Sequence, residues 1–125
     1  MLSFHHTVKK APRDKQETFL FLKEKILGKK YELECVFIGT TRAKTLNLTY
    51  RNKSYTPNIL SFPIDDQTGT IFLCLPILKI QAKKEGMPLA DYIRFLFIHG
   101  CLHLKGLDHG DEMERQEDRY FKLSA

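Results

Sequence analysis

The sequence predicts an α+β domain built from about four strands and about five helices. Two observations support this fold class. Short apolar runs rich in β-branched and aromatic residues recur along the chain, and helix-like stretches bounded by proline or glycine separate them. The chain has 125 residues, of which 42% are hydrophobic. This size and composition favour one domain, residues 1–125, with a single core.

The first three predicted elements are a strand, a helix and a strand. Residues 2–8 form a short run of aromatic and β-branched residues that ends before a proline. The helix that follows extends to residue 27, because its apolar residues fall on one stripe, Asp14 can cap its start and Gly28 can end it. The apolar run LECVFIG at residues 33–39 predicts a buried strand.

The next predicted helix is capped by one of the two threonines that follow this strand. Ala43, Leu46 and Tyr50 share one face of the helix. Arg51 lies near its end and leads into a loop that contains Pro57.

Two more strands are predicted to pair as an antiparallel hairpin. Residues 59–64 read ILSFPI and residues 69–75 read GTIFLCL, and both have a strand-like composition. The turn-forming sequence DDQTG lies between them.

Three helices complete the predicted fold. Pro76 fits the first turn of a helix that ends at Gly86, and Pro88 opens a longer one that Gly106 can cap. The last helix, residues 111–123, is rich in charge and helix formers. Its residues able to pack inward are Met113, Tyr120 and Phe121.

Positive charge is concentrated in the first half of the chain. Residues 1–53 hold 12 basic and 5 acidic side chains, whereas residues 54–125 hold 8 and 10, which together give the formal net charge of +5. Such a basic region attracts polyanions, of which nucleic acid is the commonest, but it is equally consistent with a merely soluble surface.

Cysteine usage and the absence of long apolar segments indicate a cytoplasmic protein without a membrane partner. The three cysteines are odd in number and lack the spacing of a disulfide framework, which suits a reducing compartment. The N-terminus lacks the apolar stretch of a signal peptide, and no segment reaches the roughly 18 apolar residues of a membrane span.

The sequence HGCLHLKGLDH contains three of the five histidines of the chain and predicts a metal site. His99 and His103 are four residues apart, so they lie on one face of a helix. Gly106 can end the helix and let the chain turn back, which brings His109 in as a third ligand. Three imidazole ligands and one open position are typical of a catalytic zinc site, so one Zn²⁺ per chain is predicted.

The same spacing occurs in the protease pattern H-E-x-x-H-x-x-G-x-x-H, but Gly100 replaces its glutamate. Without that general base, a minimal metalloprotease is the weakest alternative. Cys101 points away from the histidine face and is excluded as a ligand. Asp108 either orients a ligating imidazole through its second nitrogen or is a solvent-exposed acid.

These residues resemble the YbeY family of bacterial single-strand-specific endoribonucleases, also called ribosomal RNA maturation factors. The family motif H-G-x-L-H-L-x-G-Y-D-H is matched at every fixed position except that Leu107 replaces Tyr. The upstream motifs L-N-x-x-Y-R and V-L-S-F are also matched, with Ile59 in place of Val. Where the family usually has Gly-Asp-Ile, this chain has Thr70 in place of Asp.

The resemblance implies a mixed sheet of about four strands flanked by helices, with the zinc site in a cleft at the end of a core helix. It also implies that Arg51 lies near the metal, and Arg51 and His99 are the predicted catalytic residues. The basic residues predicted to guide RNA toward the cleft are Lys9, Lys10, Arg42 and Lys53.

The predicted activity is hydrolysis of single-stranded RNA, with ribosomal RNA and the small ribosomal subunit as partners, in ribosomal RNA maturation and ribosome quality control. The zinc would activate a water molecule while Arg51 steadies the phosphate. The sequence leaves the general base open between water activated by the metal, Asp108 and an RNA hydroxyl group. A ribosome assembly factor that binds RNA without cutting it would leave the same pattern.

Overall fold

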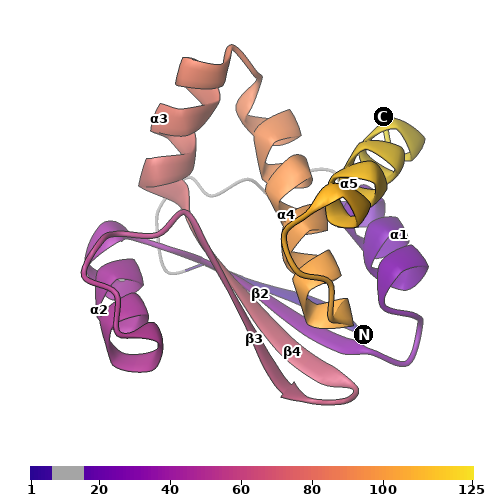
Figure 1. Ribbon diagram of the computed structural model, residues 1–125, viewed down its shortest axis with the longest axis horizontal. Helices are drawn as coiled ribbons and strands as arrows, with labels where there is room; N and C mark the ends of the chain where they lie inside the picture. Colours follow the sequence, from indigo (N-terminus) through magenta and orange to yellow (C-terminus); the bar gives the residue numbers. More distant parts are fainter. Residues whose placement is uncertain (7–15) are drawn as a thin grey trace.

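A computed structural model describes residues 1–6 and 16–125, and in them a mixed four-stranded sheet is packed with five helices (Figure 1). This confirms the predicted α+β class. The strands are β1 (Leu2–His6), β2 (Glu32–Ile38), β3 (Ile59–Asp65) and β4 (Thr68–Cys74). The helices are α1 (Gln16–Ile26), α2 (Thr40–Arg51), α3 (Leu75–Glu85), α4 (Leu89–Lys105) and α5 (Asp111–Leu123).

The sheet has the strand order β1-β2-β4-β3. β1 and β4 both run parallel to β2, whereas β3 runs antiparallel to β4. The predicted hairpin is therefore confirmed. Its turn is supported by the Asp65 carboxylate, which accepts a hydrogen bond from the backbone N–H of Gln67 at 2.9 Å.

The two faces of the sheet are covered unequally. Alternate residues of β2 point to opposite faces, so Leu33, Cys35 and Phe37 enter the main core, which α1, α3, α4 and α5 complete. Val36 and Ile38 face the other way, into a small cluster under α2. Helix α4 contacts α1, α3, α5 and β3, and it is the central helix of the main layer (Figure 1).

The packing face of α2 differs from the predicted one. Ala43 is buried and Leu46 is half-buried, but Tyr50 is 69% exposed. Asn47 takes the buried position instead, with no exposed surface. A polar residue is accepted there because its side-chain amide donates a hydrogen bond to the backbone carbonyl of Tyr55 at 2.9 Å.

The sequence predicted N-caps for α1 and α2, and the cap of α2 can be compared with the structure. Helix α2 is preceded by Gly39 at its N-cap, and no side-chain cap bond is made there, so the predicted threonine cap is wrong. The predicted residues that lie outside the described part of the chain are Val8, Lys9, Lys10, Pro12 and Asp14.

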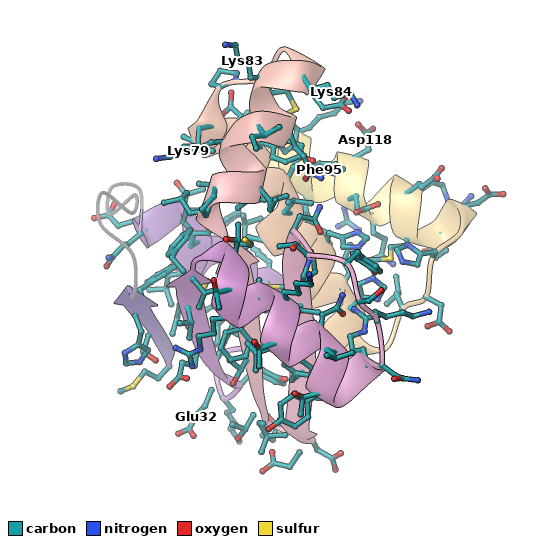
Figure 2. The ribbon with its side chains drawn as sticks, turned by 90° about the vertical axis from the view of Figure 1, so that its left-hand side faces the viewer. Glu32, Lys79, Lys83, Lys84, Phe95 and Asp118 are labelled. Atoms are coloured by element: carbon teal, nitrogen blue, oxygen red, sulfur yellow. The ribbon has the colours of Figure 1, made fainter. Side chains whose placement is uncertain are left out.

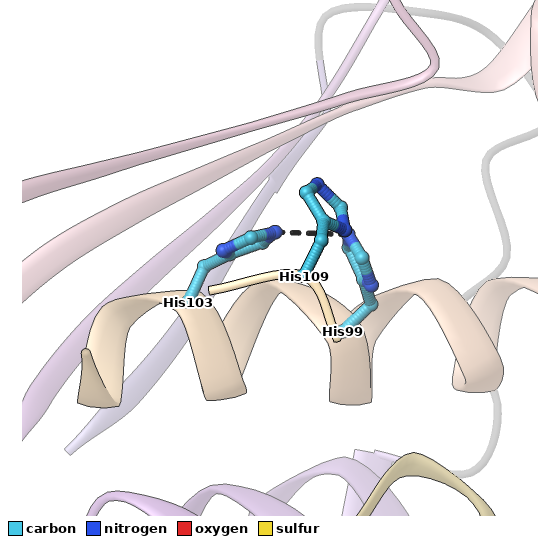
Figure 3. Close-up of side chains that lie close together, drawn as sticks. All are labelled: His99, His103 and His109. Atoms are coloured by element: carbon cyan, nitrogen blue, oxygen red, sulfur yellow. Dashed lines mark hydrogen bonds between the residues drawn. The ribbon is translucent and has the colours of Figure 1, made fainter. Parts of the chain in front are cut away.

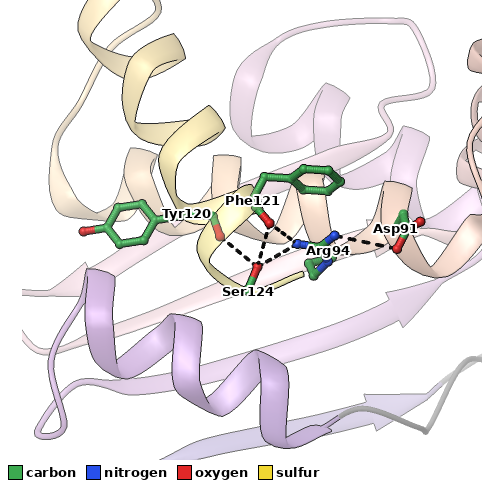
Figure 4. Close-up of polar contacts among 5 residues, drawn as sticks. All are labelled: Asp91, Arg94, Tyr120, Phe121 and Ser124. Atoms are coloured by element: carbon green, nitrogen blue, oxygen red, sulfur yellow. Dashed lines mark hydrogen bonds and ion pairs between the residues drawn. The ribbon is translucent and has the colours of Figure 1, made fainter.

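The C-terminal end of α5 is tied to α4 by Arg94 (Figure 4). Its Nη1 donates hydrogen bonds to the Phe121 carbonyl at 2.5 Å and to Ser124 Oγ at 2.7 Å. The guanidinium also lies 3.8 Å from the centre of the Phe121 ring. Arg94 is nearly buried, so these contacts compensate for the loss of its hydration and hold α5 in place against α4.

Across residues 1–6 and 16–125, none of the helices combines the length and apolarity that crossing a lipid bilayer requires.

Candidate metal centre

The C-terminal end of α4 and the turn after it bring three histidines together (Figure 3). His99 and His103 lie one helical turn apart on the same face, and their ring centroids are 4.5 Å apart. Gly106 then has φ 110°, in the left-handed region that glycine tolerates best, and the chain reverses. His109 returns to within 5.2 Å of His99 and 4.8 Å of His103, measured between ring centroids. The predicted convergence of these three rings is what the structure contains.

The donor atoms of these rings fit a shared cation. One ligand atom from each histidine lies within 4.8 Å of the others. The Nε2 atoms of His99 and His103 are 3.0 Å apart. Two nitrogens on one tetrahedral zinc ion are separated by about 3.3 Å, given Zn–N distances of about 2.0–2.1 Å. A small adjustment of the side chains would therefore accommodate an ion.

The opposite ring nitrogens show why these Nε2 atoms suit a metal. His103 Nδ1 is 3.1 Å from the Leu107 carbonyl oxygen, which only accepts, so Nδ1 carries the proton. His99 Nδ1 is 2.6 Å from Glu117 Oε2, and an ionised carboxylate also only accepts. In the neutral rings both Nε2 atoms then present lone pairs to each other. A cation between the two Nε2 atoms would accept both lone pairs. In zinc sites, a hydrogen bond from the other ring nitrogen to a carboxylate or a backbone carbonyl orients a ligating histidine in the same way.

Local electrostatics favour the metal-binding form of His103. Burial lowers the pKa of His103, and the charges of His99 and His109 lower it further. The neutral imidazole that a metal needs is thus stabilised. Cys101 lies between His99 and His103 in the same helix but is fully buried, and burial raises the pKa of its thiol well above the ordinary value. Its predicted role as a packed thiol outside the ligand set agrees with this position.

Glu117 is the site residue that sequence reasoning missed. It comes from α5, is only 8% exposed and accepts the hydrogen bond from His99. A signal for it exists in the sequence, because Met113, Glu117 and Tyr120 are spaced four and three residues apart and form the buried stripe of α5. An acidic residue in an apolar stripe is seldom buried without a specific partner.

Asp108 lies beside the histidines but is not the partner of either Nδ1 atom named above. It is exposed and lines the same cleft as the three rings. The orienting contacts come instead from Glu117 and the Leu107 carbonyl. The predicted role of Asp108 in orienting a ligating imidazole stays a prediction.

Gly100, which replaces the protease glutamate, packs against the sheet. A Cβ atom at this position would lie 3.0 Å from Ile59 Cδ1, Ile71 Cδ1 and Ser61 Oγ. The Ser61 hydroxyl also donates to the Gly100 carbonyl at 3.4 Å. A glutamate side chain would therefore have to displace the ends of these three side chains, so the packing beneath α4 disfavours a glutamate at this position.

The histidines form one wall of a cleft with a volume of about 920 Å³. A second part of the lining, the loop wall, comes from Tyr50 and Arg51 at the end of α2 and from Tyr55, Pro57 and Asn58 in the loop after it. The side chains of Tyr50, Arg51 and Tyr55 are exposed. Arg51 was predicted to lie near the metal, and it lines this cleft together with the three histidines.

Of the basic residues predicted to guide RNA, Arg42 and Lys53 lie in the described part of the chain, where both are exposed and outside the cleft lining. Arg42 has its guanidinium carbon 5.6 Å from the centre of the Phe72 ring, and Lys53 lies in the loop after α2. Exposed lysines also occur in the second half of the chain. Figure 2 shows Lys79, Lys83 and Lys84 on α3, at the end of the molecule opposite Glu32.

A family model described as "Endoribonuclease YbeY" matches residues 4–123. The chain belongs to the YbeY family. It is 40% identical over 91 residues to Endoribonuclease YbeY of Paraburkholderia phymatum, a match that covers 69% of this chain and 60% of that protein. It is 34% identical over 111 residues to Endoribonuclease YbeY of Cupriavidus necator, which covers 85% of this chain and 54% of that protein. The matched region thus covers less than two thirds of the length of each of these two relatives.

The fold is also that of a Thermotoga maritima protein whose solution structure is known. The two structures superpose with a TM-score of 0.67 over 99% of this chain and 89% of the other, at 22% sequence identity. The likeness shows that the α+β architecture of this YbeY-family chain is shared, even where most residues differ.

Proposed function

We propose that this chain is a zinc-dependent endoribonuclease that cleaves single-stranded RNA and acts in maturation and quality control of ribosomal RNA. The observation that carries the proposal is the set of three converging imidazoles in a cleft that Arg51 also lines. Membership of a family named for endoribonuclease activity supports it. The proposal treats residues 1–125 as one catalytic domain that holds one zinc ion in the cytoplasm.

His99, His103 and His109 would hold the ion through ring nitrogens. A zinc ion held by three protein ligands supplies Lewis-acid activation of water and of a phosphoryl oxygen. Glu117 keeps the His99 ring in the orientation that directs Nε2 toward the cleft. The Leu107 carbonyl does the same for His103.

Arg51 would bind the phosphate that is cut. Its guanidinium is always charged and can donate two parallel hydrogen bonds to phosphate oxygens. Because it lines the same cleft as the three histidines, it would contact a phosphate bound there. Stabilising charge that develops on the phosphate in the transition state would raise the rate of cleavage.

Among the described residues, the carboxylates of Asp108 and Glu117 line the cleft, and they would have different roles. Glu117 is already hydrogen-bonded to His99, whereas Asp108 is exposed. Asp108 is therefore the carboxylate that we assign to accept a proton during cleavage.

The test combines metal analysis with cleavage of a labelled single-stranded RNA. The wild-type protein is expected to hold about one zinc ion per chain and to cleave the RNA, and both properties should be lost in His103→Ala or after chelation. Adding zinc should restore the chelated wild type but not the variant. His5→Ala serves as the control, because His5 is exposed on β1 and lies outside the cleft.

Two outcomes would count against the proposal. Cleavage that persists in His103→Ala would exclude the histidine site as its source. A zinc-loaded protein that binds RNA but does not cut it would instead support an assembly factor.

A further inference from the structure

Two tyrosine side chains, Tyr50 and Tyr55, are exposed on the loop wall of the cleft. Tyr50 is 69% exposed and Tyr55 is 58% exposed, and both line the cleft that contains the histidines. Burying a large aromatic ring is favourable, so leaving two of them open in one cleft forgoes stability that packing would provide. Such exposed aromatic surface in a cleft is typical of a ligand site.

The Tyr50 ring is held in place although it is exposed. Its centroid lies 5.7 Å from that of Phe62 in an edge-on arrangement, with 63° between the ring planes. Phe62 contacts Phe72 at 5.8 Å between centroids, and the guanidinium of Arg42 lies over Phe72. This row of aromatic contacts anchors Tyr50 to β3 and β4 while most of its own surface stays open.

The backbone that carries Tyr55 is anchored separately. The buried side chain of Asn47 donates to the Tyr55 carbonyl at 2.9 Å, and the Asn47 carbonyl accepts from the backbone N–H of Lys53 at 3.2 Å. Pro57 is buried and lies two residues further on. The loop therefore presents Tyr55 from a fixed backbone, which reduces the entropy lost when a ligand binds.

Arg51 lies between these aromatic residues in sequence and lines the same cleft. A cationic group beside aromatic rings matches a polymer in which phosphates and flat bases alternate. Both features are present on the loop wall of the cleft.

We propose that Tyr50 and Tyr55 form a stacking platform for unpaired nucleobases next to the phosphate that Arg51 holds. The inference rests on the proposed function and extends it to how the strand is selected. Base faces in a duplex are covered by their neighbours, whereas unpaired bases can stack on aromatic side chains. The platform thus favours single-stranded RNA over paired RNA.

The experiment measures cleavage of a labelled single-stranded oligoribonucleotide by wild type, Tyr50→Ala, Tyr50→Phe and Tyr55→Ala. Each alanine variant is expected to raise KM by about tenfold, because one stacking contact is lost, while kcat changes by less than about threefold. Tyr50→Phe keeps the ring and should keep the wild-type KM. Leu48→Ala is the matched control, since Leu48 is 54% exposed on the same helix but does not line the cleft.

A second substrate isolates the stacking contact. In a set of oligonucleotides, single nucleotides on either side of the cleaved bond are replaced by abasic ones. At the position that stacks on Tyr50, the abasic change should raise the wild-type KM by about tenfold and leave the KM of Tyr50→Ala unchanged. A merely structural role for Tyr50 would make the two effects add.

The inference is overturned if both alanine variants keep the wild-type KM, or if each abasic effect is the same in wild type and in both alanine variants. An equal loss in Leu48→Ala also overturns it. If wild type does not cleave RNA at all, the proposed function fails, and the platform is then judged by fluorescence anisotropy with the same oligonucleotides. An affinity for the oligonucleotide that depends on both the base and Tyr50 supports the platform. An affinity that is the same without the base and without Tyr50 excludes it, as does binding to a protein partner alone.

Discussion

The two walls of the cleft are built in contrasting ways. On the histidine wall, formed by α4, the turn after it and α5, the three rings contact one another pairwise, and nearly buried Glu117 orients one of them. This wall lies on the main core. On the loop wall, formed by the end of α2 and the loop residues Tyr55, Pro57 and Asn58, the side chains of Tyr50, Arg51 and Tyr55 are exposed. Their backbone is tied down mainly through Asn47.

The difference follows from what each wall has to do. A metal site requires ligand positions accurate to about 0.5 Å, which only packed and hydrogen-bonded side chains maintain. Groups that contact a long, variable ligand must stay open to solvent, so they contribute little to stability. Substitutions on the histidine wall should therefore change folding or metal affinity, whereas those on the loop wall should change turnover or substrate binding alone.

The largest expected effect comes from placing a glutamate beneath the histidine wall. Gly100→Glu should lower the free energy of unfolding by more than about 4 kcal/mol, because the side chain meets Ile59, Ile71 and Ser61 in the packed layer. Urea denaturation measures this, and no peptidase activity should appear. Lys105→Glu, an exposed change on the same helix, should cost less than about 1 kcal/mol. A stable Gly100→Glu protein would contradict the packing argument.

Arg51→Ala tests the loop wall and should separate turnover from metal binding. Loss of the guanidinium should lower kcat on labelled RNA by about 100-fold, because its charge acts on the phosphate in the transition state. Zinc content and Tm should stay at wild-type values, since Arg51 is exposed and lies on the loop wall, outside the three histidines. Mass spectrometry of bound metal provides the comparison. Zinc loss in this variant would mean that the two walls are not independent.

Glu117→Gln should weaken zinc binding without unfolding the protein. The amide keeps the size of the side chain but replaces a charged acceptor for His99 with a neutral one. Zinc affinity is expected to fall by about 10-fold to 30-fold, which competition with a chelating dye would measure. The matched control is Asp118→Asn, because Asp118 is the next residue, is exposed and pairs with Lys122 on the same helix at 2.9 Å. Equal effects in both variants would argue for a general charge effect.

Ser124→Ala should give the smallest effect and reports on how α5 is attached. The change removes the hydroxyl that accepts from Arg94 and donates to the Tyr120 carbonyl. The expected loss is about 1 kcal/mol in the free energy of unfolding, measured in urea. Arg115→Ala, which removes an exposed pair with Glu112, should cost less than about 0.5 kcal/mol. If both cost the same, the link from Arg94 to α5 does not stabilise the histidine wall.

Local features of this protein could be predicted from the sequence alone. The spacing of His99 and His103, the reversal at Gly106 and the hairpin between β3 and β4 each depend on residues a few positions apart. Helical periodicity, turn chemistry and positive φ act over that range. The predicted convergence of the three histidines and the predicted element order were correct for this reason.

Only the tertiary structure decided what depends on residues far apart in the chain. It pairs β2 with both β1 and β4, sets Glu117 against His99 across 18 residues, and brings Arg51 into the same cleft as the histidines. It also buries Asn47 and exposes Tyr50, the reverse of what polarity suggests. These choices depend on which surfaces meet when helices and strands pack together, and the periodicity of a single helix or strand does not contain that information.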